Sequence, residues 1–281
     1  MEIFAEEFEA GLGLAMENTF GVFANPTVWV PGSCELQPTI DQREVEWAIG
    51  EWDERHLQDG LRANDGSLSI QVCPGLDSIF FGAAGILSRR DKRHLRSFST
   101  VEVTGDEAIY HRGIVVDSWE LKAAKEEDLV LDLDCKGVWG TKGAAMTPDY
   151  AALPTAYILT ELDITLLGQQ RIEFDTLSIK GEHELRDDIY GNTAYRQDIT
   201  TQRRKLSVSL EGYRDPEAAL YNAYLSQSVV TMVAKWTRGA SSRTATIGAA
   251  RVMEYSDDAL RQTVELKLLK PAVGTDSIVW S

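Results

Sequence analysis

The stretch that decides the fold is Ile114-Val-Val-Asp-Ser-Trp-Glu-Leu-Lys-Ala-Ala-Lys-Glu-Glu-Asp-Leu-Val-Leu-Asp-Leu-Asp-Cys-Lys136. Its second half alternates between apolar and polar residues. One side carries Leu129, Leu131, Leu133 and Cys135, and the other carries Val130, Asp132, Asp134 and Lys136. A period of two is typical of a β-strand with one buried face and one solvated face.

The first half of the stretch repeats this pattern. Its apolar side holds Val115, Trp119, Leu121 and Ala123, opposite Ser118, Glu120 and Lys122, and Asp117 interrupts the apolar side. The charged residues 125–127 between the halves are costly to bury, so we expect the chain to turn there. The stretch therefore predicts an antiparallel hairpin with an apolar back and a charged front.

Further alternating segments indicate a protein made mainly of strands. They lie at 67–73, 97–103, 157–181, 206–211, 229–236, 246–255 and 263–269. Within 157–181 the apolar phase shifts by one residue after Phe174, as a β-bulge would cause. Residues 137–152 are expected to form a loop, and residues 186–195 a hairpin tip or an extended loop.

Two short helices are expected between these strands. Residues 76–87 are apolar with several small side chains, which favours a short buried helix. Asp215-Pro216-Glu217 is a typical helix start, and apolar residues follow it at helical spacing. The pattern predicts a mainly β fold, an antiparallel β-sandwich or barrel with two short flanking α-helices. We expect residues 1–281 to form a single domain.

Residues 1–66 are poorly periodic, and we interpret them as an N-terminal arm or loop region. The segment is acidic, yet it carries the large aromatic residues Trp29, Trp47 and Trp52. It could order against a neighbouring subunit, or it could pack as a loop on its own domain.

The formal net charge of −16 argues against a protein that grips nucleic acid, because phosphate binding is largely electrostatic. The charge is unevenly spread. Residues 1–60 hold thirteen Asp and Glu against two Arg, whereas two clusters are basic. These clusters are Arg89, Arg90, Lys92, Arg93 and Arg96, and Arg203, Arg204 and Lys205. They are either solvated surface or complementary contacts between copies of the chain.

The sequence favours a cytoplasmic chain without a membrane span. No window holds about eighteen apolar residues, and the acidic N-terminus does not resemble a secretory signal. The three cysteines, Cys34, Cys73 and Cys135, are far apart, which predicts reduced, buried thiols and no structural zinc site. A disulfide between subunits, formed after release into an oxidising medium, is the alternative.

No motif for catalysis is present. The four histidines are far apart in sequence, so we expect no metal ligands among them and no cofactor. Two carboxylate pairs, Glu161 with Asp163 and Asp132 with Asp134, fit a solvated strand face better than the contrasting carboxylates of a glycosidase. We therefore predict a protein that is not an enzyme.

Three stretches resemble the major tail tube proteins of tailed bacteriophages. The first is Gly11-Leu-Gly-Leu-Ala-Met-Glu-Asn-Thr-Phe-Gly-Val-Phe-Ala-Asn-Pro-Thr-Val-Trp-Val-Pro31. The second joins His111-Arg-Gly-Ile-Val-Val-Asp-Ser-Trp-Glu-Leu to Leu129-Val-Leu-Asp-Leu-Asp-Cys-Lys-Gly137, with Glu126 and Glu127 where the family's turn has glycine. The third runs from Ile199 through Arg203 and Arg204 to Ser209, then Asp215-Pro216-Glu217 and Arg238-Gly239.

The resemblance implies a structural virion protein of the tail, assembled in the host cytoplasm. Such proteins form hexameric rings that stack head to tail into a tube with an acidic lumen, through which DNA passes without being held. The implied partners are other copies of the chain, a tape-measure protein, and the tail-terminator and tip proteins. No membrane partner is implied.

Strand alternation then assigns residues to surfaces. Neighbours of buried residues must point the other way, so we expect the lumen to be lined by Glu120, Asp132, Asp134, Ser207, Ser209 and Glu211. The aromatic and basic residues expected between subunits are Trp29, Trp47, Trp52, Arg89, Arg90, Arg93, Arg203 and Arg204.

Three alternatives remain open at this point. A distal tail or tail-completion protein would form one ring instead of a polymer. A β-sandwich carbohydrate-binding module could use exposed tryptophans, and a glycosidase could use the carboxylate pairs.

Overall fold

The computed structural model describes residues 11–45, 56–81, 84–104, 106–144, 146–147, 155–191, 193–214, 218–258, 260–269 and 277–281. Within these ranges the chain forms sixteen β-strands and one α-helix. This confirms a mainly β fold. No helix in the described ranges is long and apolar enough to cross a membrane.

The first eight strands cover the N-terminal half of the chain. They are β1 (Gly11–Met16), β2 (Val28–Cys34), β3 (Gln37–Val45), β4 (His56–Gln71), β5 (Phe98–Thr104), β6 (Glu107–Ala124), β7 (Val130–Gly137) and β8 (Trp139–Ala144). The remaining elements are β9 (Leu162–Leu166), β10 (Gln169–Arg171), β11 (Phe174–Ile189), β12 (Asp198–Tyr213), α1 (Ala219–Ser226), β13 (Val230–Arg238), β14 (Ser241–Asp257), β15 (Arg261–Leu268) and β16 (Val279–Trp280).

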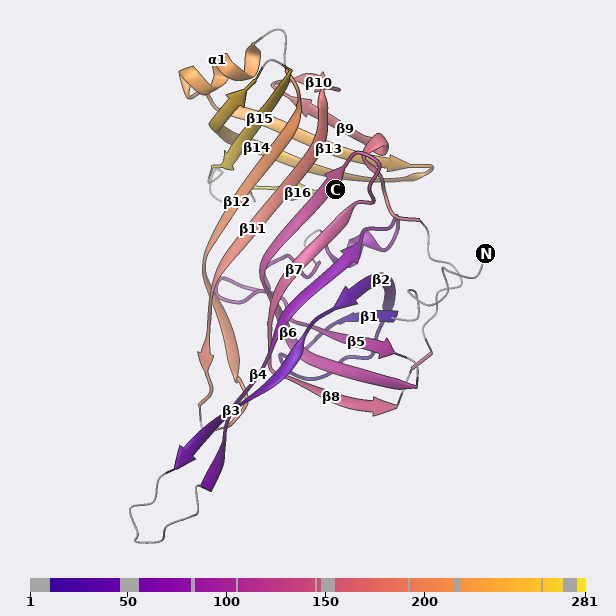
Figure 1. Cartoon of the computed structure of the whole chain (residues 1–281), viewed down its shortest axis with the longest axis vertical. Coiled ribbons are helices and arrows are strands. Elements are labelled where there is room, and N and C mark those ends of the chain that lie inside the picture. The colour runs from indigo at the N-terminus through magenta and orange to yellow at the C-terminus, as the bar shows by residue number, and fades with distance from the viewer. Residues whose placement is uncertain are drawn as a thin grey trace.

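Strand β6 is the element that joins the two parts of the molecule (Figure 1). Its first half pairs with β5 on one side and β8 on the other, and its second half pairs with β7 and β11. The expected hairpin of residues 114–136 is confirmed. It turns between Ala124 and Val130, where Glu126 adopts a left-handed conformation with φ 65°.

Six strands close into an antiparallel barrel. Following the pairings, β6 contacts β5, β5 contacts β1, β1 contacts β2, β2 contacts β4, β4 contacts β7, and β7 returns to β6. The barrel buries the apolar side of the hairpin, including Leu129, Leu131, Leu133 and Cys135. Because these six strands form a closed ring of pairings, none of them ends the barrel as an unpaired edge.

The other side of β6 extends into an open antiparallel sheet. Its order is β6, β11, β12, β15, β14, β13, β9 and β10, with β16 added to β14. The long strands β11 and β12 run beside β6, and α1 lies at the far end of the sheet, near β14 and β15 (Figure 1). Tyr224 of α1 stacks on Tyr255 of β14, which fixes the helix on the sheet.

Two of the register shifts in the sheet bear on the sequence analysis. The predicted bulge near Phe174 is confirmed, because the register of β11 against β12 shifts between Phe174 and Thr176. A second shift, between Val116 and Ser118 of β6, was not predicted. It explains why Asp117 interrupts the apolar side and why Val115 packs with Leu95 and Ile199 in a separate small cluster, away from Trp119.

Three expectations about local structure need correction. The helix expected at 76–87 is a single 3-10 turn, Asp77–Ile79, held by an ion pair of 2.8 Å between Asp77 and Arg243. The loop expected at 137–152 contains β8, and the poorly periodic segment 1–66 contains β1, β2, β3 and the start of β4. The expected second helix is α1, while its proposed starting residues 215–217 lie outside the described ranges.

One glycine is needed for a close approach across β6 and β11. Gly181 is paired with Trp119, and a Cβ atom at residue 181 would lie 2.2 Å from the Trp119 Nε1 atom. The indole ring thus covers the backbone of Gly181 and fills the space that its missing side chain leaves. Trp119 is buried, so the ring has little room to move.

We expect Gly181→Ala to lower the free energy of unfolding by about 1–3 kcal/mol, because the added methyl group overpacks the site. The matched control is Gly248→Ala in β14, where a Cβ atom would meet no atom within 4 Å. Chemical denaturation of both variants tests this. Equal stability of the two variants would contradict the prediction.

Candidate functional site

The candidate functional site is a polar sheet face that runs across β4, β7, β6, β11, β12 and β15. Cross-strand pairing aligns its side chains in rows. One row contains Ser69, Asp132, Glu120, Lys180, Ser207 and Lys267, and a second contains Ser67, Asp134, Ser118, Glu182 and Lys205. A third contains Lys122, Ser178, Ser209 and Glu265, and Glu211 pairs with Thr176 and Thr263 beyond it.

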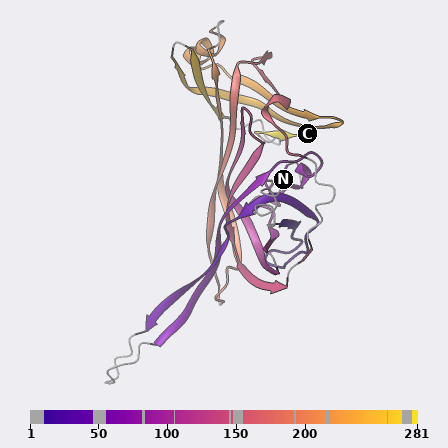
Figure 2. The same cartoon turned by 45° about the vertical axis from the view of Figure 1, so that its right-hand side comes forward.

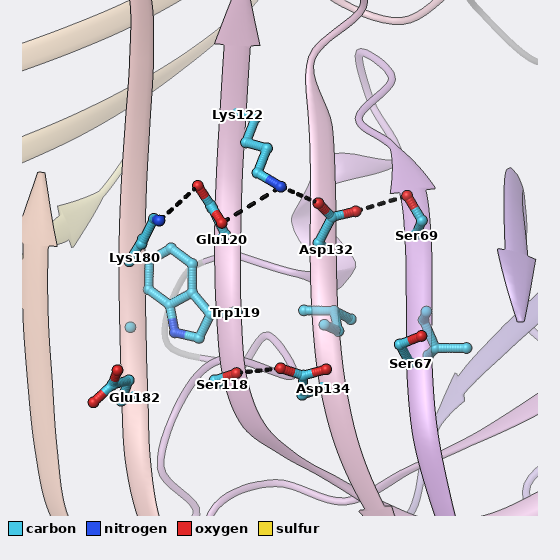
Figure 3. A pocket seen from close by; sticks show the side chains of 13 residues that line it. Ser67, Ser69, Ser118, Trp119, Glu120, Lys122, Asp132, Asp134, Lys180 and Glu182 are labelled. Atoms are coloured by element: carbon cyan, nitrogen blue, oxygen red, sulfur yellow. Dashed lines mark hydrogen bonds and ion pairs between the residues drawn. The ribbon is translucent and has the colours of Figure 1, made fainter. Parts of the chain in front are cut away.

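The rows are joined by ion pairs and hydrogen bonds (Figure 3). The Lys122 ammonium lies 2.8 Å from Asp132 and 3.4 Å from Glu120, and Lys180 lies 3.2 Å from Glu120. The hydroxyl of Ser69 donates to Asp132 at 2.7 Å, and that of Ser118 donates to Asp134 at 2.6 Å. Neighbouring strands are thus linked by their side chains as well as by their backbones.

These contacts set the protonation states of Asp132 and Lys122, the pair at the centre of the face. Partial burial would raise the pKa of Asp132, but hydrogen bonds from Lys122 and Ser69 more than offset it, so the net pKa is lowered. The hydrogen bond to Asp132 raises the pKa of Lys122. Both groups are therefore charged at neutral pH.

The face is hollowed in two adjoining places, and both hollows are predominantly acidic. Their charged lining residues are Glu120, Lys122, Glu127, Asp132, Asp134, Lys180, Glu182, Glu211 and Glu265. Carboxylates outnumber the lysines Lys122 and Lys180, so the surface repels anions while its ion pairs stiffen it.

A second feature is the hairpin of β3 and β4, which projects from the body of the molecule (Figure 2). Pairs from Gln37 with Asp65 to Val45 with His56 hold the two strands together. Its root is held by Arg196, which lies in the connection between β11 and β12 and whose side chain is only 6% exposed.

Arg196 makes contacts on three sides. Its two terminal nitrogens both donate to the carboxylate of Asp65 in β4, one of them at 3.0 Å. Nη1 also donates to the Gly137 carbonyl at 3.0 Å, and Nη2 lies 3.0 Å from Asp187. The guanidinium thereby ties the root of the projecting hairpin to the ends of β7 and β11.

The family comparison decides the identity of this β-rich chain. The phage tail tube protein family matches residues 8–268. The chain belongs to the phage tail tube protein family. No curated protein matches the chain. Membership gives the tail tube protein a structural role in the virion tail, where it assembles with itself and with other tail proteins into a tube.

The expected lumen residues of the tail tube protein lie together. Glu120, Asp132, Asp134, Ser207, Ser209 and Glu211 all project from one face, opposite the buried residues that alternate with them. Strand alternation in the sequence also places Ser118 and Lys122 on this face. Sequence reasoning missed the side chains that only the pairing of distant strands adds: Ser67, Ser69, Lys180, Glu182, Glu265 and Lys267.

The two basic clusters of the tail tube protein also meet in space. The segment around Arg93 packs on β12, where Thr201 N donates to the Arg93 carbonyl at 2.7 Å and His94 contacts Asp198 at 3.1 Å. Burial lowers the pKa of His183 to about 4, and the charges of Arg204 and Arg89 contribute to the shift. Arg89, Arg90, Arg93 and Arg203 are exposed, and Arg204 is half-buried.

Of the three aromatic residues expected between subunits, the structure describes Trp29. Trp29 is half-buried and packs against Val101, Val103 and Ala108 of its own chain. Trp47 and Trp52 lie outside the described residues. Every tryptophan that the structure describes is buried or half-buried, so the described surface offers no exposed indole as a platform for sugars.

The remaining sequence candidates have ordinary partners. Glu161 is bound by Arg238, whose Nε lies 2.5 Å from it, and Asp163 accepts a hydrogen bond from Gln170 at 3.0 Å. Neither arrangement resembles a pair of catalytic carboxylates across a cleft. The three thiols are free, with Cys73 and Cys135 buried and Cys34 half-buried. Among the described residues, one group of possible metal ligands occurs: Cys34, Glu102 and His111.

The Asp65–Arg196 pair predicts a pH-dependent contribution to stability. Burial would raise the pKa of Asp65, but the hydrogen bonds and charge of Arg196 more than offset it, so the folded-state pKa is lowered. A lowered pKa stabilises the fold above the ordinary aspartate value. This stability is lost as the pH falls through the folded-state pKa.

We expect Asp65→Asn to cost about 1–3 kcal/mol of unfolding free energy at neutral pH, because Arg196 loses its charged partner. The difference from the wild-type protein should shrink in acid. Denaturant titrations at several pH values measure it, with Asp106→Asn at an exposed position as the control. A difference that stays constant with pH would contradict the assignment.

Proposed function

We propose that this tail tube protein forms hexameric rings that stack head to tail, and that the polar sheet face lines the channel. DNA and a tape-measure protein pass through this channel. The observation that carries the proposal is the continuous face formed by six strands, whose opposite side is buried core. A polar sheet face must be solvated, and in a tube the water-filled lumen can solvate it.

The charges of the face suit a channel through which DNA slides. The two hollows carry an excess of carboxylates, so a phosphate backbone is repelled. Lys122 and Lys180 are held in ion pairs with Glu120 and Asp132, so they are less available to bind phosphate. The wall is therefore acidic, polar and stiff.

The open sheet offers one edge for joining neighbours, and the projecting hairpin offers another. In the path of described strands, β3 and β10 form the two ends, each paired on one side only. Pairing with strands of adjacent subunits would cover such edges and continue the sheet around a ring. The barrel, by contrast, is closed and contributes no edge to this pairing.

An exposed apolar patch supports contacts between copies as well. Ile172, Tyr213 and Leu260 are 89%, 59% and 73% exposed. Backbone hydrogen bonds of Tyr213 to Glu173 and of Arg214 to Leu260 bring these segments together. Large apolar side chains that gather on a surface mark a contact site more often than free surface.

A distal tail or tail-completion protein, which forms one ring, is the second candidate. Negative-stain electron microscopy of the purified chain separates the two. We expect long tubes built from rings of six subunits. Single rings at every protein concentration would favour the ring protein, and a monomer at every concentration would overturn the proposal.

A charge reversal on the polar face tests its place in the lumen. Asp134 and Glu211 are exposed and, within the described residues, take part in no ion pair. Asp134→Lys with Glu211→Lys should leave tubes intact but slow DNA ejection from virions, since a cationic wall holds phosphate.

The control for this variant reverses two exposed carboxylates outside the hollows, Glu107→Lys with Asp163→Lys. It should eject DNA at the normal rate. Normal ejection from virions that carry the lumen variant would place the polar face elsewhere.

Charge reversal in the basic cluster around Arg89 tests whether charge contacts join the subunits. Each exposed ion pair contributes only about 0–1 kcal/mol, but every subunit of a ring repeats it. Replacing Arg89, Arg90 and Arg93 by Glu should leave a folded chain that needs a higher protein concentration to form tubes. The effect should be strongest at low salt.

The matched control replaces Arg186, Lys235 and Arg251, three exposed basic residues outside the cluster, by Glu. Sedimentation of tubes over a range of protein and salt concentrations measures assembly. Equal assembly of the two triple variants would show that the cluster has no special role.

A further inference from the structure

Three strands of the barrel bring a thiol, a carboxylate and an imidazole together. Cys34 ends β2, Glu102 lies in β5, and His111 lies in β6. One ligand atom from each of these side chains lies within 4.8 Å of the other two, and Cys34 Sγ is 3.9 Å from His111 Nε2. The proposed tube function uses none of these groups.

The imidazole is held in a fixed orientation. His111 and Asn64 are both fully buried, and the Asn64 side-chain amide lies 3.0–3.2 Å from His111 Nδ1. When Nδ1–H donates to Asn64 Oδ1, the lone pair of Nε2 points at Cys34. Such an outer partner is typical of histidine ligands to metals, because it fixes the tautomer and the ring plane.

The space beside this ring depends on Gly140. A Cβ atom at residue 140 would lie 2.9 Å from His111 Nδ1, so a larger residue would displace the imidazole. The pairing of His111 with Gly140 across β6 and β8 places the glycine there. Backbone and side chain thus both hold the ring in one position.

The remaining polar groups lack partners. The half-buried carboxylate of Glu102 forms no hydrogen bond or ion pair with any residue that the structure describes. The Oγ1 atom of Thr100 is fully buried, and it finds no hydrogen-bond partner within those same residues. Thr100 pairs with His111 across the strands and shares a sheet face with Glu102, so both groups border the imidazole.

We propose that Cys34, Glu102 and His111 bind one zinc ion, with water as the fourth ligand and Thr100 as a hydrogen-bond partner of that water. Zinc accepts this mixture of sulfur, nitrogen and oxygen, whereas magnesium and calcium prefer oxygen alone. On binding, the thiol releases its proton to solvent, so the thiolate and the carboxylate balance the charge of the ion.

The separation of Cys34 and His111 is close to what such a site needs, and Glu102 lies within 4.8 Å of both. Usual zinc–ligand bond lengths in a tetrahedral site place neighbouring ligand atoms about 3.3–3.8 Å apart. The Cys34–His111 separation of 3.9 Å therefore closes with a small movement of the thiol. The ion would tie β2, β5 and β6 together, and through Asn64 it would act on β4 at the root of the projecting hairpin.

The test is a metal titration of the full chain, purified in chelator and then freed of it. We expect one Zn²⁺ per chain by competition with a chromogenic chelator. Co²⁺ should give an absorption band from thiolate-to-cobalt charge transfer. Cys34→Ser should abolish the band, while Cys73→Ser, which removes a buried thiol outside the cluster, should retain it.

The orienting role of Asn64 has its own readout. Asn64→Ala should weaken zinc binding about 10–100-fold but keep the charge-transfer band, because the three ligands remain. Alkylation gives a measurement that needs no variant. Stoichiometric zinc should protect Cys34 from iodoacetamide, as judged by mass spectrometry of the wild-type peptides.

Three outcomes overturn the proposal. One is the absence of stoichiometric zinc binding, and another is unchanged binding by a folded Cys34→Ser variant. The third is rapid alkylation of Cys34 that zinc does not slow, which would indicate a free, activated thiol paired with His111. None of these outcomes bears on whether the chain forms tubes.

Discussion

The structure depends on the burial of one row of side chains along the hairpin of β6 and β7. Burying a leucine contributes about 1.5–3 kcal/mol, and Leu121, Leu129, Leu131 and Leu133 are all buried. Because strand side chains alternate, this burial forces their neighbours to the other face. The row of carboxylates and lysines is thus a consequence of the core, and its position cannot change without a shift of register.

The sequence predicts the parts of this structure that depend on local alternation. The hairpin, its turn, the bulge at Phe174 and the polar direction of Asp132 or Ser209 all follow from neighbouring residues. In the sequence, the bulge at Asp117 shows only as one carboxylate that interrupts the apolar side of the strand. Only the pairing with β7 shows that it moves Val115 to another face of the sheet.

Features that depend on distant strands were beyond such reasoning. Lys180 joins the polar face because β11 pairs with β6, and no local pattern predicts that pairing. The long separations among the cysteines and among the histidines argued against a metal site, yet three different strands place Cys34, Glu102 and His111 side by side. The sequence predicts a helix at 76–87, but an apolar segment without helical periodicity also fits a short 3-10 turn. There, the buried Asp77 is satisfied by Arg243.

Strand β6 belongs to both the barrel and the open sheet, and this has a mechanical consequence. At about 3.4 Å per residue, this strand of eighteen residues is roughly 60 Å long. Its first half lies between β5 and β8, and its second half lies between β7 of the barrel and β11 of the open sheet, so a pull along the strand direction is shared by all four neighbours. Hydrogen bonds to β5, β7, β8 and β11 then bear the load in shear, all at once, and do not open one after another. Force along β6 therefore does not peel this strand from its neighbours one hydrogen bond at a time.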